Sequence, residues 1–241
     1  MDNFRNYWII SLSIILAILA LIASYFGSSE FGFQNFEDTV RIISIPVQFF
    51  IPIISLMLGY AAIVGEIERG SMSSLTTYPV TRLEIIIGKF LGLGSVISTI
   101  VIIGFGISGL IIAFNVNNPN IGFYLLFIFV SILHGLIYLS LALLFSALFK
   151  KRSSSMAGVI LLWFFFNMIW SFIMFGILIF AGIDIYNPAD WYFQIQLLNP
   201  SSSSGLIGLE IINDYLIIVS LFVWIIIPIF LSYWLFKKKD I

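Results

Sequence analysis

Long apolar runs alternate with short polar gaps along this chain. A helix that crosses the hydrocarbon core of a bilayer needs about 20 predominantly apolar residues. The pattern predicts six spans, at about residues 7–27, 43–64, 84–114, 121–149, 154–182 and 214–236. The third, fourth and fifth runs are the longest, so their helices either tilt or project beyond the bilayer. We therefore predict an all-α membrane protein, with one transmembrane domain over residues 1–241.

The composition supports lipid as the surroundings of these runs. Hydrophobic residues make up 61% of the 241 residues and charged residues only 10%, whereas soluble domains carry about 25% charged residues. A soluble domain of this length could not bury so much apolar surface. The chain contains no cysteine, which excludes disulfides, thiolate metal sites and cysteine nucleophiles.

The basic residues are distributed unequally between the two sides of the six-span arrangement. With both termini in the cytoplasm, ten of the eleven Lys and Arg residues face inward and Arg41 faces outward. The inward bases are Arg5, Arg69, Arg82, Lys89, Lys150, Lys151, Arg152, Lys237, Lys238 and Lys239. This asymmetry follows the positive-inside rule, and one missed or added span would scramble it. We predict a multi-pass protein of the cell membrane with both termini cytoplasmic.

The gap between the fifth and sixth runs, residues 183–213, is itself partly apolar. The stretches WYFQIQLL and SGLIGLEII flank NPSSSS, which favours a turn. We expect short amphipathic or re-entrant helices at the outer interface. Such helices can enter the bilayer only where protein or water satisfies their backbone groups.

A compact polar segment, residues 65–89, separates the second and third runs and reads GEIERGSMSSLTTYPVTRLEIIIGK. Gly70 permits a sharp break in the chain. Ser71 or a following serine can cap a short helix, which Pro79 would end. The T-R-L-E sequence at Thr81 has the capping-box form that begins the next helix. The pattern predicts a short helix on the cytoplasmic membrane face; an ordinary loop that anchors two spans is the alternative.

The order of residues in this segment resembles the cytoplasmic loop of ABC-2-type permeases, the membrane subunits of one branch of ABC transporters. The family pattern is Gly-x-Glu-x-Glu-x-Gly, then leucine, then Pro-Val/Ile-Ser/Thr-Arg, then an apolar run that ends in Gly-Lys. This chain carries these residues at Gly65, Glu66, Glu68, Gly70, Leu75, Pro79, Val80, Thr81, Arg82, Gly88 and Lys89, with Glu66 directly after Gly65. Ser71 and Thr76 replace the commoner Thr and Leu. The number of spans, the place of the loop and the chain length also agree with the family.

The resemblance implies that the short polar helix is a coupling helix that contacts a separate ATP-binding subunit. The implied contact residues are Glu66, Glu68, Arg69, Gly70, Ser71, Pro79 and Arg82. The turn at Lys150, Lys151 and Arg152 is a candidate second contact, although the positive-inside rule alone requires a basic inner loop there. The resemblance also implies export and a second permease copy, as a homodimer or heterodimer within the lipid. We expect no nucleic-acid partner.

The sequence carries no phosphate-binding loop of its own. Such a loop needs the pattern GxxxxGK[ST], whose backbone amides and lysine hold the phosphates. The Gly88-Lys89 pair is followed by Phe90 and lacks the first glycine. We therefore expect no cofactor and no enzymatic site in this chain, with ATP and Mg bound by the partner subunit.

Two polar side chains within the apolar runs, His134 and Asn167, are candidates for lining a transport path. Hydrogen bonding between helices is the alternative for both. A lone histidine without cysteine or a nearby acid is a poor metal site. The sequence GISG around Ser108 has the form seen in rhomboid-type proteases. However, Ser108 lies about 9 Å and His134 about 20 Å from the outer ends of their helices, which disfavours a catalytic pair.

The deep parts of the predicted spans contain few ionisable groups. Secondary carriers usually hold buried carboxylates or broken helices at the midplane, and neither is evident. Phenylalanine alone accounts for 25 residues, so an apolar or amphipathic cargo fits the predicted path better than a small ion. We expect an exporter of such a cargo; an ATP-independent secondary carrier or a membrane scaffold protein is the alternative.

Overall fold

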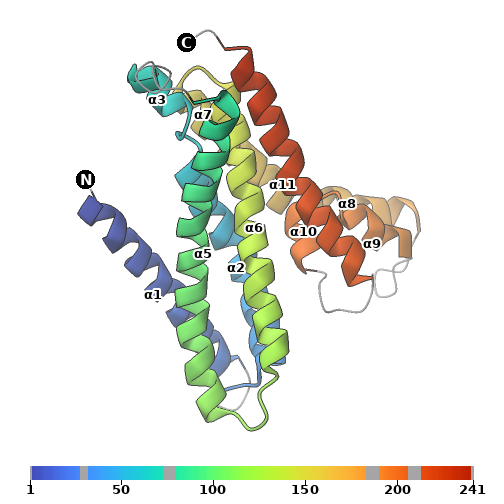
Figure 1. The fold of residues 1–241 in the computed structure, drawn as a ribbon. Helices are drawn as coiled ribbons and strands as arrows, with labels where there is room; N and C mark the ends of the chain where they lie inside the picture. Colours follow the sequence, from blue (N-terminus) through green and yellow to red (C-terminus); the bar gives the residue numbers. More distant parts are fainter. Residues whose placement is uncertain (1, 28–31, 73–79, 183–189, 206–212, 240–241) are drawn as a thin grey trace.

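The computed structural model describes residues 2–27, 32–72, 80–182, 190–205 and 213–239. These residues form helices and connecting turns (Figure 1). The helices are α1 (Asp2–Phe26), α2 (Phe36–Gly59), α3 (Val64–Glu68), α5 (Arg82–Asn115), α6 (Ile121–Leu148), α7 (Arg152–Phe164), the π-helix η1 (Phe165–Ile169), α8 (Trp170–Phe180), α9 (Asp190–Gln196), α10 (Pro200–Gly205) and α11 (Asp214–Lys237).

Six helical stretches within the described residues are long and apolar enough to cross a membrane. They are Ile9–Phe26, Phe36–Glu68, Arg82–Asn115, Ile121–Leu148, Arg152–Phe180 and Tyr215–Lys237. The predicted all-α class and the number of spans are thus confirmed.

Helix α2 begins seven residues before the predicted start of the second span. The side chain of Asn35 accepts a hydrogen bond from the backbone N–H of Asp38 at 3.1 Å and so caps the helix. Glu37 and Asp38 lie in the first turn, where a helix favours negative charge. Phe36 is buried and stacks on Tyr124 with ring centroids 4.3 Å apart. The helix thus begins before the predicted apolar span, because a hydropathy pattern counts these acids as loop residues.

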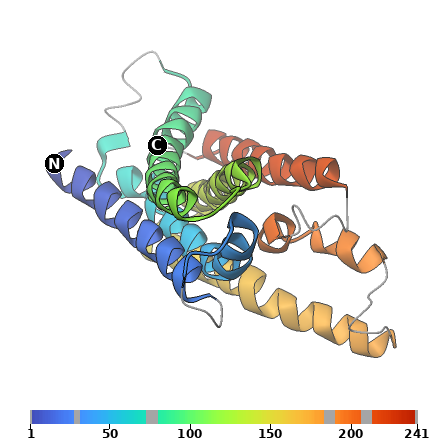
Figure 2. The same cartoon turned by 90° about the horizontal axis from the view of Figure 1, so that it is seen from below.

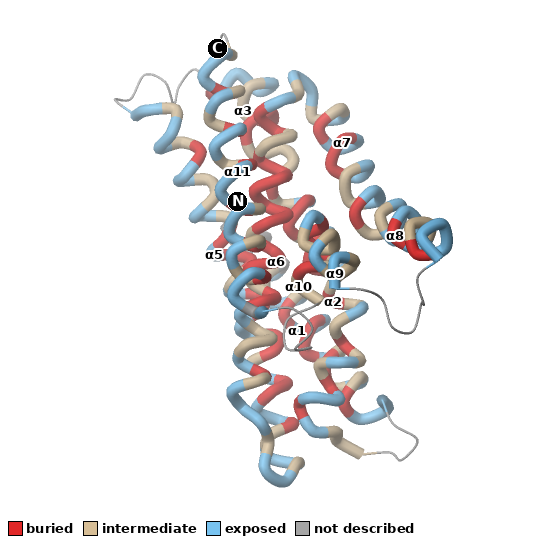
Figure 3. Tube along the Cα trace, turned by 90° about the vertical axis from the view of Figure 1, so that its right-hand side faces the viewer, coloured by how far each residue is buried: buried red, intermediate tan, exposed pale blue. Residues whose placement is uncertain are grey.

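Helix α6 forms the centre of the bundle, and buried positions run along its length (Figure 3). Helices α2, α5, α7, α10 and α11 all pack against it. Helix α2 approaches very closely at Gly59, where an added Cβ would lie 2.6 Å from the Cβ of Ala142. Helix α1 packs mainly on α5, at the edge of the bundle.

Helices α7, η1 and α8 follow one another as an arm that extends away from the rest of the bundle (Figure 2). Large apolar side chains of α8 are exposed in the single chain, among them Phe172, Phe175 and Phe180. Such a surface requires lipid or another membrane chain against it.

Two short helices, α9 and α10, form in the gap between the fifth and sixth spans, where short helices were predicted. Asn199, just before α10, is buried and donates a hydrogen bond to the backbone oxygen of Phe166 at 2.8 Å. Helix α10 thereby contacts the π-helix η1 as well as α2, α6 and α11. The placement of these helices at an outer interface stays a prediction.

A proline in α11 leaves a backbone oxygen that a neighbouring helix satisfies. Pro228 has no N–H to donate to the oxygen of Trp224, four residues earlier. The hydroxyl of Ser140 on α6 donates to that oxygen at 3.2 Å. Such compensation between helices allows a membrane helix to keep an internal proline.

Candidate functional site

The polar segment after α2 forms an elbow, which we define as residues 60–72. The elbow contains α3 and lies at the same end of the bundle as the C-terminus and the turn between α6 and α7 (Figure 1). Gly70 follows α3 with a φ of 71°, a left-handed conformation that glycine adopts at little cost. The predicted break at Gly70 is therefore present. The rest of the predicted coupling helix, including Pro79, lies outside the described residues.

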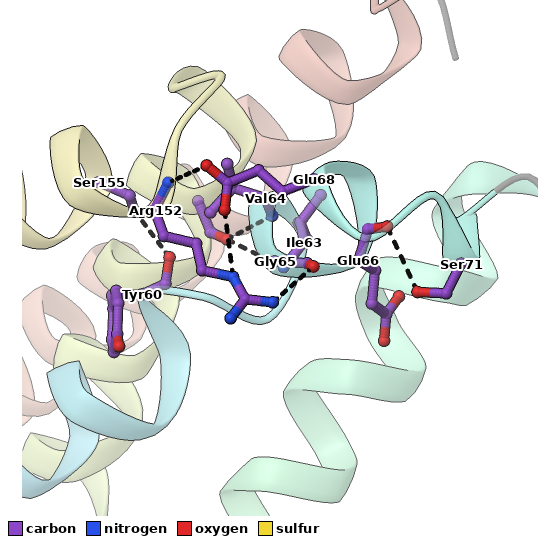
Figure 4. Close-up of polar contacts among 10 residues, drawn as sticks. Tyr60, Ile63, Val64, Gly65, Glu66, Glu68, Ser71, Arg152 and Ser155 are labelled. Atoms are coloured by element: carbon purple, nitrogen blue, oxygen red, sulfur yellow. Dashed lines mark hydrogen bonds and ion pairs between the residues drawn. The ribbon is translucent and has the colours of Figure 1, made fainter.

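Two serines from other helices hold the first turn of the elbow. The backbone N–H groups of Ile63 and Val64 both donate to the hydroxyl oxygen of Ser146 on α6, at 2.9 and 3.0 Å. The hydroxyl of Ser155 on α7 donates to the backbone oxygen of Tyr60 at 2.7 Å (Figure 4). The side chain of α7 thus satisfies a backbone oxygen at the end of α2, and the side chain of α6 satisfies two N–H groups at the start of α3.

Both glutamates of the elbow are paired within the chain. The ammonium group of Lys89 on α5 lies 2.5 Å from Oε1 of Glu66. Arg152 donates its backbone N–H to Oε1 of Glu68 at 2.9 Å, and its Nε faces Oε2 at 3.3 Å as an ion pair. Nη2 of Arg152 also donates to the backbone oxygen of Gly65 at 2.7 Å. These side chains are partly exposed, so we expect the pairs to position the elbow more than to stabilise the fold.

Arg82 contacts the end of helix α11. Its Nη1 donates to three backbone oxygens, which belong to Phe236, Lys237 and Lys239 at 2.6, 2.9 and 2.8 Å. A cation at a helix C-terminus is stabilised by the unpaired carbonyl groups there. Lys239 in turn donates to the backbone oxygen of Phe149, at the end of α6, at 2.6 Å. Burial, and secondarily the charge of Lys150, lowers the pKa of the Lys239 ammonium group.

The start of α5 has the predicted capping box. The hydroxyl of Thr81 accepts from the backbone N–H of Glu84 at 3.2 Å, and the carboxylate of Glu84 accepts from the backbone N–H of Thr81 at 2.6 Å. Within the elbow, the hydroxyl of Ser71 donates to the backbone oxygen of Glu66 at 3.3 Å. These local bonds fix where the elbow ends and where the next span begins.

Several cations at the elbow end are exposed and pair with no described residue. They are Arg69, Lys150, Lys151 and Lys237. Because Glu66 and Glu68 are already paired, the charge that this end presents to its surroundings is mainly basic. The contact of these residues with an ATP-binding subunit stays a prediction.

A cavity of about 400 Å³ lies toward the other end of the bundle, between α2, α6 and α10. His134 lines it and is 1% exposed. Asn167 does not line this cavity; its amide donates to the backbone oxygen of Trp163 and to the hydroxyl of Tyr138, and accepts from Ser201. Of the two side chains predicted to line a path, His134 is placed at a cavity and Asn167 joins helices.

Ser108 and His134 do not form a catalytic pair. The hydroxyl of Ser108 donates to the backbone of its own helix at Gly104 and lies 3.1 Å from the hydroxyl of Tyr124. Within the described part of the chain, no group of three His, Cys, Asp or Glu side chains could hold a metal ion.

Sequence reasoning missed the two serines that hold the elbow. Ser146 interrupts the apolar run ALLFSALF, and a hydroxyl in such a run signals a bonded partner. Its partners are backbone groups some 80 residues away, which no side-chain pattern reveals.

The comparisons with known proteins agree with this arrangement. The whole chain, residues 1–241, matches the family model described as ABC-2 family transporter protein. Two relatives, from Stutzerimonas stutzeri and Pseudomonas aeruginosa, are each described as a probable ABC transporter permease protein NosY. Each is 29% identical to this chain, over 99% and 100% of the chain and 95% of each relative. The family predicted from the sequence is thus confirmed over the whole chain. The chain belongs to the ABC-2 transporter family as a multi-pass permease subunit, and ATP is hydrolysed by a partner ATP-binding subunit.

Proposed function

We propose that this permease is the membrane subunit of an exporter and that an ATP-binding subunit moves it through the elbow. Both termini and the elbow lie in the cytoplasm in this proposal, as the distribution of basic residues favours. The observation that carries the proposal is that the elbow is attached to three helices besides α2.

The three attachments come from different sides. Glu66 binds Lys89 on α5, the hydroxyl of Ser146 on α6 accepts two elbow N–H groups, and Arg152 on α7 binds Glu68. A displacement of the elbow therefore passes to α5, α6 and α7 together with α2. ATP can drive such a displacement only if the ATP-binding subunit contacts the elbow differently in its two states.

The predicted contact residues then divide into two groups. Glu66 and Glu68 shape the elbow from within, because each is paired inside the chain. Arg82 is also bonded inside the chain, where it joins the start of α5 to the end of α11. Arg69, Lys150 and Lys151 are exposed and remain for an acidic surface on the ATP-binding subunit. Gly70 and Ser71 form the turn that follows α3.

A second permease copy completes the proposed assembly, and a homodimer is the simplest closed form. The exposed apolar surface of α8 supports a membrane-embedded contact there. We propose an apolar or amphipathic cargo, because the interior of the bundle offers mainly aliphatic and aromatic side chains. A secondary carrier is disfavoured because the buried polar residues of the described chain include no Asp or Glu.

The proposal is tested by purifying the permease with the ATP-binding chain that accompanies it in its own membrane. Replacing Glu68→Gln together with Arg152→Gln removes one attachment, so we expect ATP hydrolysis to continue while transport falls. Asp38→Asn, an exposed acid of α2 outside the cavity and at the other end of the bundle, is the control for a lost carboxylate. Failure to retain any ATP-binding chain, or unchanged coupling in the double variant, would contradict the proposal.

A further inference from the structure

The cavity between α2, α6 and α10 has one polar wall and one apolar wall. The polar side chains of α2 lie on one helical face and are Glu37, Arg41, Ser44 and Gln48. On α6, Phe123, Phe127 and Val130 lead to His134. The volume of about 400 Å³ lies within the range of small-molecule sites.

The cavity is open at one end and closed at the other. Arg41 and Glu37 are exposed, whereas Val130, Ser131 and His134 are buried. Seven residues of helix separate Arg41 from Gln48, which is a depth of about 10 Å. A bound molecule would therefore meet charge at the mouth, aromatic and aliphatic side chains along its length and a polar floor.

Arg41 at the mouth carries an unused positive charge. Its guanidinium group forms no hydrogen bond or ion pair with any described residue, and its backbone oxygen accepts a hydrogen bond from the hydroxyl of Ser44 at 3.0 Å. The neighbouring acid, Glu37, is bonded at its Oε1 by the amide of Asn120 at 2.7 Å. Arg41 is also the base that the six-span arrangement leaves on the outer side, against the positive-inside tendency. A guanidinium group in this setting suits a carboxylate or phosphate.

His134 at the floor is a second, independent sign of a ligand. Neither of its ring nitrogens hydrogen-bonds a described residue, although the side chain is 1% exposed. The backbone oxygens of Gln48 and Pro200 lie near the ring without meeting it in hydrogen-bond geometry. The oxygen of Gln48 is itself free of a helical partner because Pro52 has no N–H. A buried imidazole without partners costs free energy, which a hydroxyl or amide group of a ligand would recover.

We propose that this cavity binds an amphipathic anion. A carboxylate or phosphate head lies at Arg41, an apolar body packs on α6, and a hydrogen-bonding group about 10 Å deeper reaches His134. This ligand would also be the transported cargo, and that part of the inference rests on the proposed function. Binding of the ligand requires the permease alone. A membrane lipid and a free amphiphile share this chemistry.

The test measures equilibrium binding to the full-length permease in phosphatidylcholine nanodiscs, without ATP. The probes are ω-hydroxydecanoate, decanoate and decyltrimethylammonium. We expect ω-hydroxydecanoate to bind more tightly than decanoate, and the cation to bind at least about tenfold more weakly. Arg41→Gln should weaken binding of both acids about tenfold, whereas Arg69→Gln at the elbow, an equal loss of charge, should not.

The floor is tested separately. His134→Phe should abolish the preference for the hydroxylated acid and keep the preference for anions, and His134→Gln, which can still hydrogen-bond, should retain both. Melting temperatures of the variants show whether each is folded. Equal binding of anion and cation, or an unchanged affinity in Arg41→Gln, would overturn the inference.

Phosphatidylglycerol added to the nanodiscs distinguishes the two sources of the ligand. Competition with ω-hydroxydecanoate supports a lipid as the occupant, and absence of competition supports a free amphiphile. Because ATP is absent from this measurement, unchanged coupling in the elbow double variant would overturn the proposed function without affecting the binding result. Absence of head-group selectivity would overturn the cavity inference and leave the elbow proposal intact.

Discussion

At the scale of single residues, Ser146 has the largest role in holding the elbow. It is fully buried, and its hydroxyl oxygen accepts the N–H groups of Ile63 and Val64. Ser146→Ala leaves both groups without this acceptor, so we expect a loss of about 1–2 kcal/mol in the free energy of unfolding. Thermal unfolding in detergent measures the change. Ser153→Ala is the control, because the side chain of Ser153 is exposed and bonds no described residue; an equal loss in both variants would contradict this role.

Gly59 is a second residue that controls packing, because its lack of a Cβ lets α2 approach α6 closely. A Cβ there would lie 2.6 Å from the Cβ of Ala142, so α2 and α6 must separate. We expect Gly59→Ala to destabilise the protein by about 1–3 kcal/mol. Gly92→Ala, whose added Cβ meets nothing within 4 Å, should cause no loss. Equal melting temperatures for the two variants would show that the helices do not pack as closely as described.

Residue types could be predicted at this scale, but their partners could not. The sequence identified Glu66, Glu68, Arg69 and Arg82 as a charged segment at a break in the chain. It could not show that Glu68 meets Arg152, because these residues are 84 positions apart. Pairing across that separation depends on how α3 and α7 approach each other, which side-chain spacing within one segment does not determine.

At the scale of elements, proline and serine act together in α6 and α11. Ser140→Ala should destabilise the protein because the backbone oxygen of Trp224 loses its donor. In a Pro228→Ala background the helix can supply its own N–H at that position, so the same change should cost less. A double-mutant cycle on the free energy of unfolding measures this difference. Additive effects of the two substitutions would contradict the compensation.

The six long helices could be predicted because each apolar run approaches or exceeds the length that a bilayer demands. Irregular turns and exact helix starts within these stretches could not be predicted. The π-helix η1 lies inside the fifth apolar run, and one of its backbone oxygens accepts a hydrogen bond from Asn199 of a distant segment. The start of α2 at Phe36 was likewise hidden, because acids at a helix N-terminus look like loop residues in a hydropathy pattern.

At the scale of the whole molecule, the two ends of the bundle differ in their surface features. The elbow end presents exposed bases, and the other end contains the cavity beneath Arg41. If the bases meet an acidic surface, Lys150→Gln with Lys151→Gln should weaken association with the ATP-binding subunit and reduce its dependence on salt. Binding measured at low and high ionic strength tests this expectation.

The matched control for the basic turn is Lys237→Gln, which removes an equally exposed charge at the same end but on α11. It should leave association nearly unchanged. If Lys237→Gln weakens association as much per removed charge as the double variant does, the attraction depends on net charge, without a defined contact at the turn.

The central claim is that the elbow of this ABC-2 permease contacts the ATP-binding subunit, and site-directed cross-linking tests it most directly. The chain contains no cysteine, so Arg69→Cys introduces a single reactive thiol in the elbow. Asn117→Cys places an equally exposed thiol at the opposite end, after α5. We predict that a short cross-linker joins the ATP-binding subunit to the Arg69→Cys permease, with a yield that changes on adding ATP, and leaves the Asn117→Cys permease unlinked. Cross-linking from position 117, or none from position 69 in the active complex, would contradict the account.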